Sequence, residues 1–245
     1  TGWQVSLQAQ SGDYFDRYNR FGCLESASNE LDWHDNPEMA PMGNHISIYF
    51  NSIIESSVVP MTSDLRQTLD QVQIWDGEIS GLGLTEPVEL SWHVEKALPI
   101  DIAVNMIDLN TRRVLDLSVP DLYLLGDIDD RYSRQVKIVA GDPGQVALIV
   151  DEILATIPEE LSLDGNYPNP FNPVTVIEYG LPAVSNLSIK IFDIRGRMLM
   201  QEIENGLEPG YYTFFWDAAA YSSGIYFIQF RVSDIIQTYR VLLLK

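Results

Sequence analysis

The sequence predicts an all-β protein built from two β-sandwich domains. Short β-branched and aromatic runs recur along the chain, turn signals separate them, and 13 prolines and 16 glycines leave little room for long helices. A length of 245 residues is enough for two modest domains. We assign an acidic accessory β-sandwich to 1–156, a linker to 157–163 and an immunoglobulin-like sandwich of about seven strands to 164–245.

Apolar and polar residues alternate through the first region, as half-buried strands require. In 3–9, for example, Trp3, Val5 and Leu7 would share one face. Two segments could be helical, the short polar segment 63–71 and the apolar segment 147–155. Further strands are predicted at 45–50, 72–79, 88–94, 102–109 and 136–140.

Charge is unevenly distributed. Residues 1–160 carry 27 acidic against 9 basic side chains, a balance of −18, whereas 161–245 carry 8 against 6, a balance of −2. An acidic surface repels phosphate backbones and anionic membranes, so nucleic acid is not an expected partner. The boundary is placed at Pro158, which interrupts ladder hydrogen bonding and is followed by two solvent-seeking acids.

Cys23 is the only cysteine, so no disulfide can form within the chain. No apolar run approaches the roughly 20 residues that a membrane-spanning helix needs. The sequence opens at Thr1 without a signal peptide, so an export signal would have been removed or would lie upstream.

The segment 166–173 holds three prolines in eight residues, which excludes a helix or a central strand. We expect a stiff, extended strap, with Tyr167 and Phe171 pinning it onto the core. Arg195-Gly196 predicts a hairpin turn because glycine accepts positive φ. Strands are predicted at 175–179, 187–193, 198–203, 211–216, 225–232 and 237–244.

The order of these motifs resembles the C-terminal sorting domain of type IX secretion cargo, the Por secretion tail, over about 161–245. Two positions depart from the usual pattern, Arg240 in place of a lysine and Ala218 in place of a glycine. The first region is similar to the accessory β-sandwiches that precede such domains. The sorting-signal positions are Asn166, Tyr167, Pro168, Asn169, Pro170, Phe171, Asn172, Pro173, Gly196, Arg197, Trp216, Asp217, Gly224, Tyr226 and Lys245.

The resemblance implies a secreted protein of a Gram-negative bacterium, located outside the cell or on the outer-membrane surface. Its partners would be the type IX machinery, namely an outer-membrane shuttle and a sortase-like protease that in many members removes the domain and joins the cargo to a glycolipid. We expect a non-enzymatic surface protein, or the C-terminal portion of one. Its apolar last strand, 241–244, suits strand addition between copies in an extracellular assembly or filament.

Acidic loops are the candidate metal site. Calcium takes 6–8 oxygen ligands, which loops rich in Asp and Asn can supply. The spacing matches no EF-hand, and 127–130 lacks the glycine and glutamate of that loop. Solvated turns capped by Asx hydrogen bonds are the favoured alternative. The calcium candidates are Asp13, Asp16, Asn19, Asp32 and Asp35.

No pattern indicates catalysis. The three histidines have no metal-ligand spacing, no nucleophile elbow or phosphate-binding loop occurs, and Cys23 is expected to be a buried structural thiol. We therefore do not expect an enzyme. The alternative function is a calcium-assisted glycan-binding module of a larger secreted enzyme, with Trp33 as the stacking residue because it lies among polar loop residues.

Overall fold

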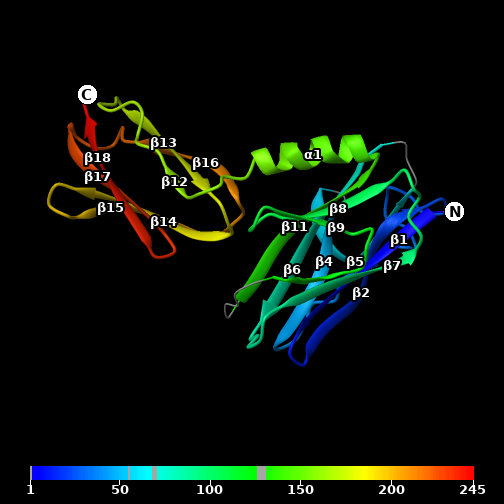
Figure 1. The fold of residues 1–245 in the computed structure, drawn as a ribbon. Coiled ribbons are helices and arrows are strands. Elements are labelled where there is room, and N and C mark those ends of the chain that lie inside the picture. Colours follow the sequence, from blue (N-terminus) through cyan, green and yellow to red (C-terminus); the bar gives the residue numbers. More distant parts are fainter. Residues whose placement is uncertain (1, 55, 68–70, 126–130) are drawn as a thin grey trace. The chain divides into compact units, whose positions relative to one another are not determined.

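The computed structural model describes residues 2–54, 56–67, 71–125 and 131–245, so 127–130 lie outside the described residues. The chain divides into two compact units, Thr1–Leu154 and Ala155–Lys245. The predicted linker, 157–163, falls within the second unit. Both units are built from β-sheets, which confirms the predicted class (Figure 1).

The first unit forms an 11-stranded sheet in the order β10-β7-β1-β2-β5-β4-β6-β11-β8-β9, with β3 paired to β5 off this path. β2 and β5 run parallel, and the other neighbours run antiparallel. The strands are β1 (Gly2–Ser11), β2 (Tyr14–Leu24), β3 (Asn36–Pro37), β4 (His45–Ile54), β5 (Ser57–Gln67), β6 (Gln73–Leu82), β7 (Glu89–Lys96), β8 (Ala103–Asp108), β9 (Arg113–Asp116), β10 (Leu122–Leu124) and β11 (Arg131–Gly141).

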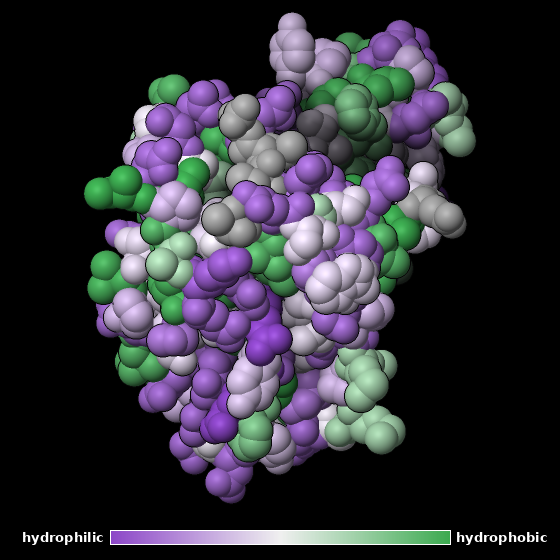
Figure 2. Space-filling view, turned by 90° about the vertical axis from the view of Figure 1, so that its right-hand side faces the viewer, coloured by the Kyte–Doolittle hydropathy of each residue, from purple (hydrophilic) through white to green (hydrophobic). Residues whose placement is uncertain are grey.

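This sheet folds over on itself around one core. The hydroxyl of Tyr123 on β10 donates to the buried carboxylate of Asp108 at the end of β8 (3.0 Å), so strands from opposite ends of the order meet. Three aromatic rings pack edge-to-face at the centre, with centroids 5.3–6.0 Å apart: Trp3, Phe21 and Trp75. Edge-to-face contact is a favoured geometry for aromatic rings. Hydrophilic and hydrophobic side chains are interspersed over the face in Figure 2.

Two predictions for this unit were wrong. The calcium candidates Asp16 and Asn19 do not lie in an acidic loop, because both are part of β2. A bulge separates these two residues in the β1–β2 pairing, and Tyr18 there has a φ of 72°, which obscures the strand period. The segment 63–67 is part of β5 rather than a helix.

The second segment that could be helical does form a helix, α1 (Pro143–Ala155). Asp142 caps it, accepting hydrogen bonds on Oδ1 from the N–H groups of Gly144 and Gln145. Proline at the first helical position fits this start, since its missing N–H would have no partner there. Val146 and Val150, four residues apart, form the buried stripe.

The second unit is a sandwich of seven strands, which confirms the predicted count. A three-stranded sheet, β12-β13-β16, faces a four-stranded sheet, β15-β14-β17-β18, across a shared core. The strands are β12 (Ser162–Leu163), β13 (Val174–Leu181), β14 (Ser185–Asp193), β15 (Met198–Leu207), β16 (Gly210–Asp217), β17 (Gly224–Val232) and β18 (Ile235–Leu243).

Candidate functional site

The proline-rich strap lies along the last strand of the second unit. Phe171 N–H donates to the Leu242 carbonyl (2.9 Å), and Leu244 N–H donates to the Phe171 carbonyl (3.0 Å). The Asn169 side chain extends this pairing, because its Oδ1 accepts from Leu242 N–H and its Nδ2 donates to the Arg240 carbonyl. The strap thus pairs with the C-terminal half of the edge of β18.

A small polar network holds the start of the strap. The Asn166 amide donates to the Pro168 carbonyl (3.1 Å) and to Thr175 Oγ1 (3.0 Å). The Thr175 hydroxyl donates in turn to the same carbonyl (2.9 Å), and this side chain is buried. At the far end of the strap the Pro173 carbonyl accepts from Ala218 N–H. Buried polar groups that are satisfied in this way fix one conformation of the backbone.

Three of the predicted signal residues, far apart in sequence, meet in the core. The Phe171 ring lies 5.3 Å from that of Trp216, which lies 5.3 Å from that of Tyr226. The Tyr226 hydroxyl reaches the Ser222 carbonyl (2.6 Å), whereas Trp216 Nε1 has no hydrogen-bond partner among the described residues. These positions therefore build the core of the domain rather than a reactive centre.

The glycine-arginine position forms the turn between β14 and β15. Gly196 has a φ of 76°, as predicted, and Arg197 Nε donates to Asp193 Oδ2 (3.1 Å). Desolvation raises the pKa of Asp193, but hydrogen bonds from the N–H groups of Arg197 and Arg195 and the Arg197 charge together lower it by more. The net lowered pKa means that the ionised carboxylate organises this turn.

The remaining signal positions lie around the C-terminus. The Asp217 carboxylate accepts from Ala219 N–H (2.8 Å), and Gly224 opens β17 opposite Leu243. Lys245 N–H donates to Ser223 Oγ, and its ammonium group donates to the Ala219 carbonyl. The exposed residues of the strap are Tyr167, Pro168, Asn169, Pro170 and Asn172.

The prediction that Tyr167 pins the strap onto the core was wrong, because its side chain is 81% exposed. Tyr167 exchanges both backbone hydrogen bonds with Val176. Directly paired residues point to the same face of a sheet, and Val176 lies between the inward-facing Thr175 and Ile177. The pairing therefore turns Tyr167 outward, and Phe171, which is 2% exposed, anchors the strap instead.

Among the first three calcium candidates, Asp13 is exposed in a turn, and Asp16 accepts a hydrogen bond from Ile48 N–H (2.7 Å). Burial raises the pKa of Asp16, and the bond from Ile48 opposes that rise. Asn19 is fully buried. Asp16 thus links β2 to β4.

The other two candidates cap backbone groups in one loop. Asp32 accepts from the N–H groups of Ser28 (2.6 Å) and His34 (2.7 Å). Asp35 accepts from the N–H groups of Asp32 and Leu65 (both 3.0 Å). These are the Asx hydrogen bonds expected if the acidic residues cap solvated turns instead of binding calcium. Within the described part of the chain, no three His, Cys, Asp or Glu side chains gather to hold a metal ion.

Trp33 is 78% exposed, and its ring lies against that of His34 in a tilted arrangement, with a centroid distance of 3.5 Å and an interplanar angle of 32°. The other four tryptophans are buried. An exposed aromatic face of this kind can stack on a sugar ring.

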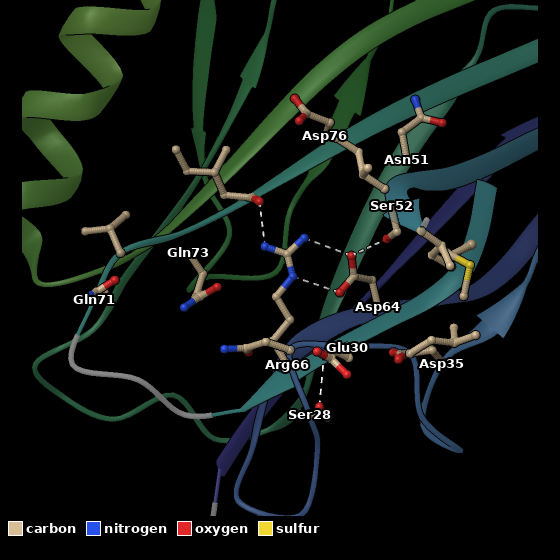
Figure 3. Close-up of a pocket in the computed structure, with 17 residues that line it drawn as sticks. Ser28, Glu30, Asp35, Asn51, Ser52, Asp64, Arg66, Gln71, Gln73 and Asp76 are labelled. Atoms are coloured by element: carbon tan, nitrogen blue, oxygen red, sulfur yellow. Dashed lines mark hydrogen bonds and ion pairs between the residues drawn. The ribbon is translucent and has the colours of Figure 1, made fainter. Parts of the chain in front are cut away.

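A polar cleft of about 970 Å³ opens on the first unit between strands β4, β5 and β6 and the loop 28–35 (Figure 3). Arg66 forms one wall, donating from Nε and Nη2 to the two carboxylate oxygens of Asp64 (both 2.9 Å) and from Nη1 to the Ile74 carbonyl. Ser52 also donates to Asp64, and the Arg66 guanidinium lies 4.7 Å from the Trp75 ring centroid. In the sequence, the i, i+2 spacing of Asp64 and Arg66 could have predicted this ion pair, because residues two apart on a strand lie on the same face.

Cys23 and two of the three histidines have defined surroundings in the first unit. Burial raises the pKa of the Cys23 thiol to about 11, the opposite of what a thiolate nucleophile needs. His34 Nε2 lies 3.0 Å from Ser26 Oγ, and His45 Nδ1 lies 2.9 Å from the Gly43 carbonyl.

Residues 166–243 match the family model of a secretion system C-terminal sorting domain. No curated protein matches the chain. The match spans the strap, the turn and the aromatic core described above. The chain therefore carries a type IX sorting domain and is a cargo of that system, exported to the cell surface or beyond. No helix in the described part of the chain has the length and apolarity to cross a bilayer.

Proposed function

We propose that this type IX secretion cargo is a non-enzymatic surface protein that serves as a subunit of an extracellular assembly. Its second unit is the export address, read by the outer-membrane shuttle and the sortase-like protease, and its first unit is the cargo. The observation that carries the export role is the strap of 166–173, which is closed onto the terminal strand by Asn169 and Phe171.

A reporter fusion tests the export role. Residues 155–245 joined to an inert periplasmic protein should carry it outside a cell that has the type IX machinery, and Phe171→Ala should retain it in the periplasm. Tyr167→Ala removes an exposed aromatic from the same strap and shows whether the outward ring is itself recognised. A reporter that stays in the periplasm with the unaltered fusion would exclude the export role.

The non-enzymatic character is supported by the buried Cys23 thiol and by the hydrogen bonds of His34 and His45. The purified chain should turn over no substrate in a panel of peptides and polysaccharides. Turnover that a single carboxylate substitution abolishes would contradict this part of the proposal.

A second candidate function, a calcium-assisted glycan-binding module of a larger secreted enzyme, is favoured by the exposure of Trp33. Its loop also contributes Glu30 and Asp35 to the polar cleft, where planar carboxylate and amide groups suit sugar hydroxyls. A glycan array with and without calcium tests it. Binding lost in Trp33→Ala and kept in Trp33→Phe would support it, and equal binding by all three would exclude it.

A further inference from the structure

One sheet edge in the second unit is bare. In the β13–β16 ladder, Ala218 N–H bonds to the Pro173 carbonyl, which makes that opposed pair a hydrogen-bonded one. Bonded and non-bonded pairs alternate along an antiparallel ladder. Tyr211, Thr213 and Phe215 therefore direct their backbone N–H and C=O groups away from β13. In the described residues no strand pairs with β16 on that side.

The other edges of this unit are blunted. β12 is only two residues long, and the strap covers the C-terminal half of β18. β15 carries Glu202 and Glu204 opposite the inward-facing Ile189 and Leu187, together with register shifts in its pairing to β14. Short strands, covering segments, inward charges and bulges all prevent edge pairing. β16 has none of these devices over 210–216, where no charged residue or proline occurs.

The side chains on this edge are aromatic and exposed. Tyr211 is 67% and Phe215 is 66% exposed. Phe215 is directly opposite Val176, which is directly opposite Tyr167, so these three side chains form one row across the outer face. An apolar row beside a bare edge is the arrangement that strand addition uses.

We propose that β16 pairs antiparallel with β16 of a second copy of this chain, about a two-fold axis at Thr213. This deepens the assembly role proposed above and is independent of the export route. The axis places Tyr211 opposite Phe215 of the second copy, and Thr213 opposite itself. The backbone N–H and C=O groups of all three residues point toward the second copy, so this register forms six backbone hydrogen bonds. It also forms two aromatic pairs across the outer face, each between Tyr211 of one copy and Phe215 of the other.

The distribution of charge also favours a second copy of this chain as the partner of β16. In this register Asp217 is opposite Pro209, and Glu208 is opposite Ala218, so no like charges meet directly across the pair. Residues 161–245 have a balance of only −2, whereas 1–160 have −18. Repulsion between the acidic units is screened over about 8 Å at physiological ionic strength. Association should therefore strengthen as salt is raised.

Cross-linking of the full chain tests the register. Thr213→Cys places two thiols opposite each other in a hydrogen-bonded pair, where the Cα separation of about 5.5 Å suits a disulfide. Mild oxidation should give a covalent dimer. Thr238→Cys is the matched control, because Thr238 is exposed on the half of β18 that the strap does not cover. Cross-linking of Thr238→Cys to the same or a greater extent would overturn the proposal.

Sedimentation analysis tests the association itself. The unaltered chain should dimerise with rising concentration, and Thr213→Pro should weaken the dimer by at least about tenfold, because proline removes an edge N–H that β13 does not use. An unchanged circular dichroism spectrum shows that the variant is folded, and Phe215→Lys provides a second block that keeps the backbone. A strictly monomeric chain at high concentration, or a dimer that both variants leave intact, would overturn the proposal. Either result leaves the reporter test of export unaffected.

Discussion

The ring of Phe171 lies 5.3 Å from that of Trp216, joining the proline-rich strap to a strand 45 positions further along the chain. Both side chains are 2% exposed. Phe171 is therefore the aromatic anchor of the strap, in addition to the hydrogen bonds that tie the strap to β13, to Ala218 at the end of β16 and to β18.

We expect Phe171→Ala to lower the free energy of unfolding of the second unit by about 3–5 kcal/mol, because it opens a cavity in an aromatic core. Urea unfolding of residues 155–245 followed by circular dichroism measures this. Tyr167→Ala is the control, since removing an exposed ring should change stability by no more than about 0.5 kcal/mol. Equal losses in the two variants would contradict the assignment of Phe171 as the anchor.

Arg66→Met should lower the unfolding free energy of the first unit by about 3 kcal/mol, because it leaves the Asp64 carboxylate in the cleft wall without its cation. Adding Asp64→Asn to this variant should restore at least about 1 kcal/mol, since the uncompensated charge is then removed. Thermal unfolding of the two single variants and the double variant measures the coupling. Additive losses would show that the pair is not coupled.

Cys23 should react slowly with thiol reagents in the native protein. With a pKa of about 11, only about one thiol in a thousand is ionised at pH 8, and the side chain is also buried. Labelling at pH 8 should be at least about 100-fold faster in denaturing urea than in buffer. Rapid labelling of the folded chain would show that the β1–β2 region opens.

Glu202→Gln should stabilise the second unit at neutral pH. Desolvation, followed by a hydrogen bond and repulsion from Glu204, raises the pKa of Glu202 above its ordinary value of 4.5, so the folded state favours the protonated form. Stability is therefore greatest below that value and falls as the pH rises through the raised pKa. Because solvent screens this side chain, the gain should be a few tenths of a kcal/mol.

Unfolding curves at several pH values test this prediction. The difference between Glu202→Gln and the unaltered chain should be present at pH 7 and vanish below about pH 4.5. Glu178→Gln, which removes an exposed charge from β13, is the control. A difference that does not depend on pH would exclude an ionisation effect.

Much of the fold could be read from local patterns. Alternation located β1, and Arg195-Gly196 located the β14–β15 turn, because both depend on residues that are neighbours in sequence. β2 was missed because its bulge and its polar residues disguise the period of two. Asp142-Pro143 is a capping signal that marks the start of α1. The prediction did not use it, because it began the possible helix only at the apolar run that follows.

The cleft could not be located in this way, because its residues come from β4, β5, β6 and a loop. Asp32 and Asp35 are of a residue type that binds metal ions, which is why the sequence suggested them as ligands. In the structure their carboxylates instead accept hydrogen bonds from backbone N–H groups that only the folded loop brings within reach.

The amino-acid sequence alone was enough to predict that the chain is all-β, that its charge is concentrated in the first region, and that its last third is a sorting domain. These properties depend on composition, period and motif order. The folded structure was needed to show that Phe171 points inward and Tyr167 outward, and that Tyr211, Thr213 and Phe215 direct their backbone groups away from β13, where no described strand pairs with them. The reason is physical: the direction of a side chain or an N–H group in a sheet is fixed by the register of its partner strand, and that partner lies far away in sequence.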